Sequence, residues 1–166
     1  FSWAAYDAVV YDVLGDVVCG GFAAPLQASH AEQVYVVVSG EVMSLFAANN
    51  VCHAVKRFAA GGVVLGGLIG NARNVRDEDT ILSRFARRLN TRMLALLPRD
   101  ESVQDAERAR RTVVEHPPAA AAAKCYTALA QRIAEARPAA LKPPRPMSEL
   151  QFDEFVKDLH AKAPAR

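Results

Sequence analysis

The sequence predicts an α/β protein with a mainly parallel sheet, and three observations lead to that class. Apolar runs rich in β-branched residues recur through the first hundred residues. These runs are continuous rather than alternating, as in strands that are buried on both faces. Segments with helical periodicity lie between them, which is the order expected of strand-helix-strand crossovers. A chain of 166 residues suits one domain with a sizeable core.

Each element is predicted from its local pattern. Strands are expected at residues 8–13, 34–38, 63–69 and 93–97. Helices are expected at about residues 42–59, 79–89, 103–115 and 119–136. The last two helices follow Pro98, where the pattern becomes purely helical, and we expect them to cover one edge of the sheet. Four prolines between residues 138 and 146 predict an extended linker.

The end of the chain is predicted to form a short amphipathic helix. Ser148 and Gln151 have the spacing of a capping box. An apolar stripe follows, made of Leu150, Phe152, Phe155, Val156 and Leu159. We expect this helix to dock either on the body of the domain or on a partner subunit. The expected organisation is therefore an α/β domain over residues 1–137, a linker over 138–147, and a helix with its tail over 148–166.

Composition excludes several classes of protein. Hydrophobic residues make up 51% and charged residues 23%, with a net charge of +2, which disfavours a disordered chain and a dedicated nucleic-acid binder. The longest stretch without a polar side chain, residues 58–70, is shorter than the roughly 18 apolar residues that span a membrane. The three cysteines form no CxxC pair, which fits neither a disulfide framework nor a zinc site within one chain. We expect a reducing, cytoplasmic location.

The most informative segment is YDVLGDVVCGGF, residues 11–22. Asp12 ends a predicted strand, at the edge where parallel sheets place their ligand-binding residues. A carboxylate there suits Mg²⁺, as in phosphoryl-transfer sites. Gly15 permits close approach of a phosphate to the backbone, and Asp16 adds a second carboxylate. On spacing alone, an ordinary strand-to-helix turn with a buried Cys19 accounts for the segment equally well.

This segment is very similar to the switch segment of the nitrogenase iron proteins and of their relatives in chlorophyll and related tetrapyrrole biosynthesis. The similarity continues through SGEVMSLFAANN at 39–50, LGGLIGNARN at 65–74, LPRDESVQDAE at 97–107 and RRTVVE at 110–115. The resemblance implies a P-loop NTPase-type three-layer fold with a mainly parallel sheet. No GxxxxGKS or GxxxxGKT motif occurs in the 166 residues. We therefore expect the N-terminal strand and P-loop portion to be absent from this chain and to precede Phe1.

The resemblance also implies an iron-sulfur cluster. In this family two identical subunits share one 4Fe–4S cluster, and each subunit contributes two cysteines. Cys19 matches one of these ligands, and the other is expected ahead of Phe1. Counting alone leaves Cys52 or Cys125 open as the second ligand.

MgATP or MgADP is the second cofactor that the resemblance implies. Asp12 would lie near Mg²⁺, directly or through water, Gly15 would contact the γ-phosphate, and Asp16 would position or deprotonate the attacking water. Residues implied on the adenine side are Asn71, Pro98, Arg99, Asp100, Gln104 and Tyr126, while Glu41 and Met43 would reach toward the nucleotide of the opposite subunit. Without the resemblance, ordinary loop caps are the simpler interpretation of these residues. Ala122 replaces an adenine-side glutamine of the nitrogenase members, which leaves nucleotide affinity open.

The function implied is that of an ATP-dependent electron donor, the reductase of a nitrogenase or nitrogenase-like two-component enzyme. Such a homodimer accepts an electron from ferredoxin or flavodoxin and passes it to a catalytic component. Gln27, Ala28 and His30 stand where nitrogenase iron proteins carry charged docking residues, which favours a catalytic partner other than molybdenum nitrogenase, such as a methylthio-alkane reductase. The final substrate stays open among dinitrogen, methylthio-alkanes and tetrapyrroles.

Two alternatives come from other classes. One is a non-catalytic remnant or regulatory binding module that keeps the nucleotide-binding fold and binds neither ATP nor iron. The other is a partitioning-type ATPase of the same fold, in which Cys19 and its neighbouring glycines would have no purpose.

Overall fold

A parallel three-stranded sheet forms the centre of the molecule, in a computed structural model that describes residues 5–13, 26 and 31–161. The order of elements is β1 (Gln33–Val38), α2 (Val42–Phe58), η2 (Ala59–Gly61), β2 (Val64–Asn71), α3 (Glu78–Arg88), β3 (Met93–Leu97), α4 (Glu101–Arg108), α5 (Ala121–Ala134), η3 (Pro138–Ala140) and α6 (Glu149–Ala161). The strands pair in the order β1-β2-β3, and both pairs are parallel. Helices α2 and α3 are therefore the two crossovers.

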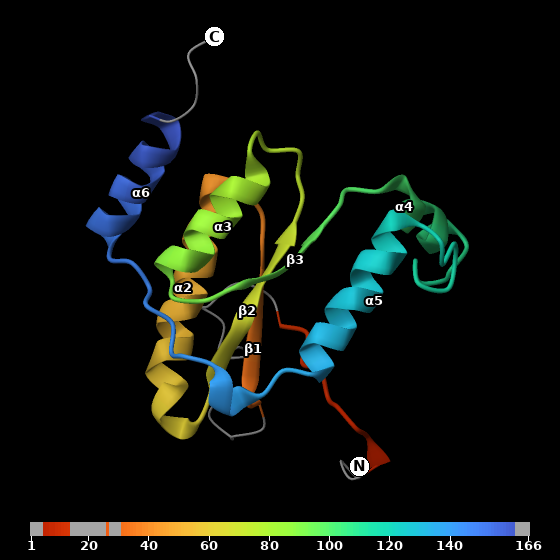
Figure 1. The fold of residues 1–166 in the computed structure, drawn as a ribbon, viewed down its shortest axis with the longest axis horizontal. Helices are drawn as coiled ribbons and strands as arrows, with labels where there is room; N and C mark the ends of the chain where they lie inside the picture. The colour runs from red at the N-terminus through yellow and green to blue at the C-terminus, as the bar shows by residue number, and fades with distance from the viewer. Residues whose placement is uncertain (1–4, 14–25, 27–30, 162–166) are drawn as a thin grey trace.

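The elements form three layers. Helices α2 and α3, with α6 beside them, lie on one side of the sheet, and α5 lies on the other (Figure 1). Ala106 of α4 packs with Ala122 and Ala123 of α5 and with Val113, which lies in the segment between the two helices. The predicted α/β class with a parallel sheet is confirmed.

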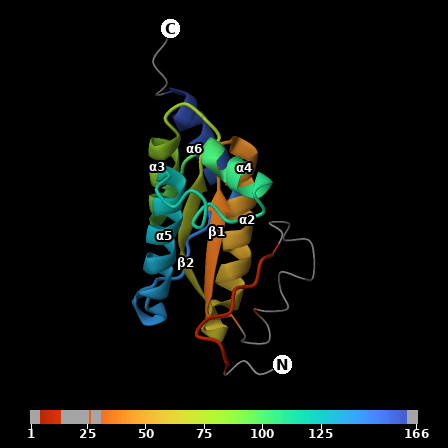
Figure 2. The same cartoon turned by 90° about the vertical axis from the view of Figure 1, so that its right-hand side faces the viewer.

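The strand predicted at residues 8–13 does not form. This segment has no regular structure, and Val10 is 87% exposed. Figure 2 shows it in red as an irregular path with no strand arrow. A run of apolar residues becomes a strand only where a neighbouring strand accepts its backbone hydrogen bonds. Within the described chain β1 pairs with β2 alone, so the run joins no strand of the sheet and Asp12 does not end a strand.

Helix α4 is shorter than the predicted helix over residues 103–115. It ends at Arg108, and Arg110 adopts a left-handed conformation with φ of 54°. The Arg111 N–H donates to the Ala106 carbonyl, and the Arg110 N–H donates to the Glu107 carbonyl. This pattern closes a helix in the way that glycine usually does. The end of the helix was not predictable from the sequence, because arginine takes the left-handed position that glycine usually occupies.

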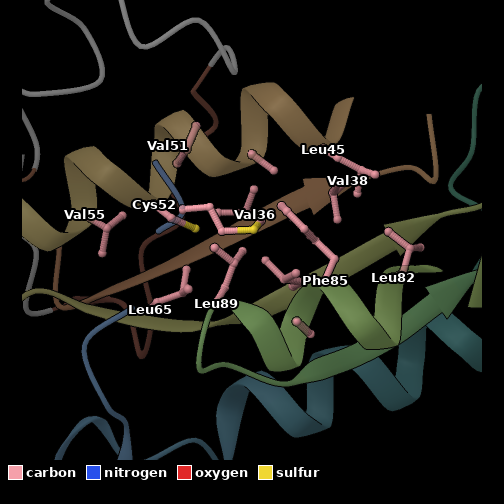
Figure 3. Close-up of a cluster of buried hydrophobic side chains, with 14 of the residues drawn as sticks. Val36, Val38, Leu45, Val51, Cys52, Val55, Leu65, Leu82, Phe85 and Leu89 are labelled. Carbon is pink, nitrogen blue, oxygen red and sulfur yellow. The ribbon is translucent and has the colours of Figure 1, made fainter. Parts of the chain in front are cut away.

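The main core lies between α2, α3 and the sheet (Figure 3). Leu45 and Cys52 from α2 meet Phe85 from α3, over Val38 and Leu65 from the strands, and all five are at most 1% exposed. The side chains of β1 at residues 34, 36 and 38 face this core, as the period of two in a strand requires. This packing fixes the position of α2 and α3 against the sheet.

A bulge between β1 and β2 explains one glycine of β2. The register passes from Val34 opposite Leu65 to Tyr35 opposite Gly67, which leaves Gly66 as an extra residue. A Cβ atom at Gly66 would lie 2.3 Å from the Tyr35 ring. Position 66 therefore has no room for a side chain next to the Tyr35 ring.

Residues 141–147 connect η3 to α6 and are bonded to the body of the domain. The Arg145 N–H donates to the Leu89 carbonyl at 2.8 Å. The buried Asn49 side chain forms two bonds with Met147, donating to its carbonyl at 2.9 Å and accepting from its N–H at 2.8 Å. Since Met147 is itself 1% exposed, this segment contributes to the core.

Helix α6 docks on the same chain, which is one of the two outcomes expected for it. Its start shows the predicted capping box, in which the Ser148 N–H donates to Gln151 and the Gln151 N–H donates to the Ser148 hydroxyl. The Phe155 ring lies 5.8 Å from the Phe85 ring of α3. Among the described residues, no helix is long and apolar enough to cross a membrane.

Candidate functional site

The carboxyl ends of the three strands bring most of the predicted nucleotide-binding residues to one edge. Val38 pairs with Gly70 and Asn71 pairs with Leu97, so the residues that follow each strand lie side by side. Glu41 follows β1, Asn71 ends β2, and residues 98–100 follow β3. Parallel sheets bind ligands at this edge.

Glu41 stands between β1 and α2 and is tied to the loop around it. Its carboxylate accepts from the Ser39 hydroxyl at 2.9 Å and lies 3.9 Å from Arg73 Nε. The Ser39 N–H donates to the Ser44 hydroxyl oxygen at 2.9 Å. Met43, on the first turn of α2, is 74% exposed. Both side chains are accessible to a ligand or to a second chain.

Glu78 is a buried residue of this edge that the sequence analysis did not identify. It is 7% exposed and begins α3. Its Oε1 accepts from the Gly40 N–H at 2.8 Å, and its Oε2 accepts from the N–H groups of Arg73 and Val75 at 2.9 and 3.3 Å. In the sequence, an acidic residue at a helix start indicates only a favourable interaction with the helix dipole.

Asp100 joins the starts of α4 and α5. Its Oδ1 accepts from the Ser102 N–H at 2.9 Å as the N-cap of α4, and its Oδ2 accepts from the Ala122 N–H at 3.2 Å. Both carboxylate oxygens are thus engaged by the protein, so Asp100 fits a role in fixing these helices better than direct contact with a base. Gln104 is exposed one turn along α4, and Tyr126 is 37% exposed one turn beyond Ala122.

Two further predicted residues follow β3. Pro98 is half-buried and Arg99 is exposed. Ala122 occupies the position at which the resemblance implies an adenine-side glutamine. It is fully buried with Ala106, Val113 and Ala123, and therefore offers no atom to a ligand.

Asp100 should make the stability of the fold depend on pH. The N–H donated by Ser102, and then that of Ala122, lower the pKa of Asp100 below its ordinary value. A depressed carboxyl pKa adds stability above the unfolded value of about 3.9, and that contribution is lost as the pH falls through the folded pKa. Asp100→Ala should therefore lower the melting temperature at pH 7, with a difference from wild type that shrinks below pH 4.

Thermal unfolding followed by circular dichroism between pH 2.5 and 7 measures this difference. Asp105→Ala is the matched control, since Asp105 is exposed on α4, where it forms an ion pair with Arg108. An Asp100→Ala difference that stays constant over this range would contradict the capping role.

The two described cysteines have apolar surroundings. Cys52 is fully buried in the main core, and burial raises the pKa of its thiol to about 12. Metals are bound by the thiolate, so this environment does not fit a ligand of a cluster between subunits. Cys125 is half-buried and packs against the cluster formed by Ile69, Leu94, Leu97 and Leu129. The alternative in which Cys52 supplies a ligand is therefore not supported.

The switch segment is described only in part. Asp12 is exposed, whereas Gly15, Asp16 and Cys19 lie outside the described residues. Among the described residues, no three His, Cys, Asp or Glu side chains gather as a metal site.

Two cavities of about 530 Å³ lie away from the carboxyl edge. One lies between the start of β3 and the end of α5, lined by Arg92, Arg132 and Arg137 among others. The other lies between α3 and α6, next to the Arg84 and Asp158 ion pair. Neither cavity is lined by a predicted site residue.

Comparison with solved structures supports the α/β fold described above. The cell division ATPase MinD of Pyrococcus furiosus matches with a TM-score of 0.51 and 19% identity over 61% of this chain, and this chain spans 42% of that one. The protein has the α/β fold of the P-loop NTPases. A family model described as 4Fe-4S iron sulfur cluster binding proteins, NifH/frxC family, matches residues 1–162. The chain belongs to this family, and the resemblance to nitrogenase iron proteins is confirmed.

Proposed function

We propose that this chain is part of the ATP-dependent electron donor of a nitrogenase or nitrogenase-like two-component enzyme. The observation that carries the proposal is the family match over residues 1–162, which includes the switch segment with Asp12, Asp16 and Cys19. When bound, a 4Fe–4S cluster supplies one-electron redox chemistry. Cys19 is the residue of this chain that would hold it.

The nucleotide is proposed to bind at the carboxyl edge, with residues of this chain in separate roles. Asp12 would hold Mg²⁺, and Gly15 would let the backbone approach the γ-phosphate. Asp16 would orient the attacking water or accept its proton. The amide of Asn71 and the exposed Tyr126 are available to the base, and Asp100 fixes the α4 and α5 starts behind them.

Coupling between nucleotide and cluster is proposed to run along the chain. Only two residues, Val17 and Val18, separate Asp16 from Cys19. If Asp16 moves when the γ-phosphate binds or leaves, the backbone that carries Cys19 moves with it. Such a movement would change the solvent exposure and hydrogen bonding of a bound cluster, and hence its reduction potential.

A homodimer is part of the proposal. Val42, Met43 and Phe46 form an exposed apolar group beside Glu41, and they are 39, 74 and 38% exposed. Apolar groups of this kind mark protein interfaces, and the position next to the carboxyl edge suits a second copy facing the nucleotide. Ferredoxin or flavodoxin is the proposed donor, a nitrogenase-like component the proposed acceptor, and the cytoplasm the proposed location.

The test is Asp16→Glu in the full-length protein, purified without oxygen. The longer side chain displaces the carboxylate from the attacking water, and we expect ATP-driven electron transfer to fall about a hundredfold while the cluster is retained. Transfer from dithionite to the catalytic component, with and without ATP, measures the effect. The control is Asp153→Glu, the same change at an exposed position of α6.

Unchanged transfer in the Asp16→Glu protein would remove Asp16 from the mechanism. A wild-type protein that binds neither cluster nor ATP would favour the alternative, a regulatory module that keeps only the fold.

A further inference from the structure

The Glu78 carboxylate connects two loops that are far apart in the sequence. Gly40, which follows β1, is 38 residues from Glu78 and donates to its Oε1 at 2.8 Å. Arg73 and Val75, in the loop after β2, donate to its Oε2 at 2.9 and 3.3 Å. The first loop carries Glu41, and the second begins directly after Asn71, the last residue of β2; both are predicted nucleotide-binding residues.

Glu78 is held by backbone donors instead of a cation. It has 7% of its surface exposed, and no ion pair among the described residues includes it. A buried carboxylate requires hydrogen-bond donors, and three backbone N–H groups of the two loops supply them. If one loop moves, at least one of these bonds to a charged group is broken, which is costly in a buried position.

Gly40 is required for this contact. A Cβ atom at position 40 would lie 2.9 Å from Cγ of Glu78 and 3.3 Å from its Oε1. A side chain there would push the carboxylate away from the Gly40 N–H. The close approach of backbone and carboxylate thus depends on both residues.

The other link between the two loops is weak. Arg73 Nε lies 3.9 Å from the Glu41 carboxylate, and both side chains are more than half exposed. Exposed pairs of this kind contribute little to stability, and salt screens them. Beyond the point where Val38 pairs with Gly70, Glu78 therefore supplies the stronger of these two polar links between the loops.

We propose that Glu78 is a positioning residue of the nucleotide site, whose carboxylate bridges the Gly40 N–H to the N–H groups of Arg73 and Val75 and so fixes Glu41 and Asn71 relative to each other. This inference rests on the proposed function, because it assumes that the edge binds a nucleotide. Glu78 touches no ligand in this account, and it acts through the two loops.

Glu78→Gln in the full-length protein, purified with its cluster, tests the proposal. The amide group keeps the size of the side chain, but its NH₂ faces an N–H donor and at least one of the three bonds is lost. We expect amide hydrogen exchange at residues 40, 73 and 75 to accelerate at least about tenfold without nucleotide. We also expect the dissociation constant for MgADP, measured by equilibrium dialysis, to rise about tenfold, with kcat at saturating MgATP unchanged within about twofold.

Two further variants complete the design. Gly40→Ala displaces the carboxylate without removing it and should reproduce both effects, which keeps the proposal testable if Glu78→Gln fails to fold. Val55→Ala, in the core of α2, destabilises the fold away from the edge and should leave the MgADP constant at its wild-type value.

The possible outcomes separate the two proposals. Faster exchange at the three amides with an unchanged MgADP constant would show a purely structural role and overturn the inference alone. An effect of Val55→Ala equal to that of Glu78→Gln would overturn it as well. A wild-type protein that does not bind MgADP would overturn the proposed function, and the inference with it.

Discussion

Cys19→Ser in the full-length protein is expected to abolish the 4Fe–4S cluster. Iron-sulfur clusters are held by thiolates, and a serine hydroxyl is a poor substitute. If each subunit contributes two cysteines to one shared cluster, the change removes half of the ligands at once. Iron and sulfide content, the visible absorption of the anaerobic protein and its EPR signal after reduction should all fall to background.

Cys125→Ser is the matched control for this prediction. Cys125 is half-buried on α5 and packs against apolar residues. The cluster should survive this change. Retention of an intact cluster in the Cys19→Ser protein would contradict the assignment, and loss of the cluster in the Cys125→Ser protein would reopen the choice of ligand.

Phe85→Ala is expected to cause the largest loss of stability. The Phe85 ring is 0% exposed, lies among the α2, α3 and sheet residues of the main core, and contacts the Phe155 ring of α6. Removing a buried ring leaves a cavity as well as unburying apolar surface, which costs about 3–5 kcal/mol. Urea unfolding of the full-length protein measures the change in unfolding free energy.

Leu150→Ala provides the comparison, since Leu150 is 77% exposed at the start of α6. We expect a change within about 0.5 kcal/mol there. If Phe85→Ala lowered the unfolding free energy no more than Leu150→Ala, the described packing of α3 and α6 would be contradicted.

The strands show what the sequence can and cannot predict. Continuous apolar runs located β1, β2 and β3 to within two residues. Residues 65–70 of β2 are buried on both faces, as the pattern indicates, whereas Val37 of β1 is 61% exposed. The run at residues 8–13 has the same pattern and forms no strand. Pairing depends on a neighbour elsewhere in space, and an apolar run alone contains no information about that neighbour.

The site shows the same division between local and distant information. Asn71 and Asp100 follow predicted strands, whereas Glu41 was assigned only by the family resemblance. The register places all three at one edge of the sheet. The role of Asp100 in capping α4 was predictable from its position before Ser102, whereas its bond to Ala122 was not. Glu78 was missed because its most distant donor lies 38 residues away.

The reduction potential of the cluster, measured with and without MgATP in the anaerobic full-length protein, tests the central claim most directly. If the chain belongs to an ATP-dependent electron donor, EPR-monitored titration should detect one 4Fe–4S cluster per dimer, and its potential should shift when MgATP binds, because Asp16 and Cys19 share one short segment. The Asp16→Glu protein should not show this shift in potential if the position of the Asp16 carboxylate is coupled to the cluster through that segment. A cluster whose potential is the same with and without MgATP, or a protein that contains no cluster, would contradict the account.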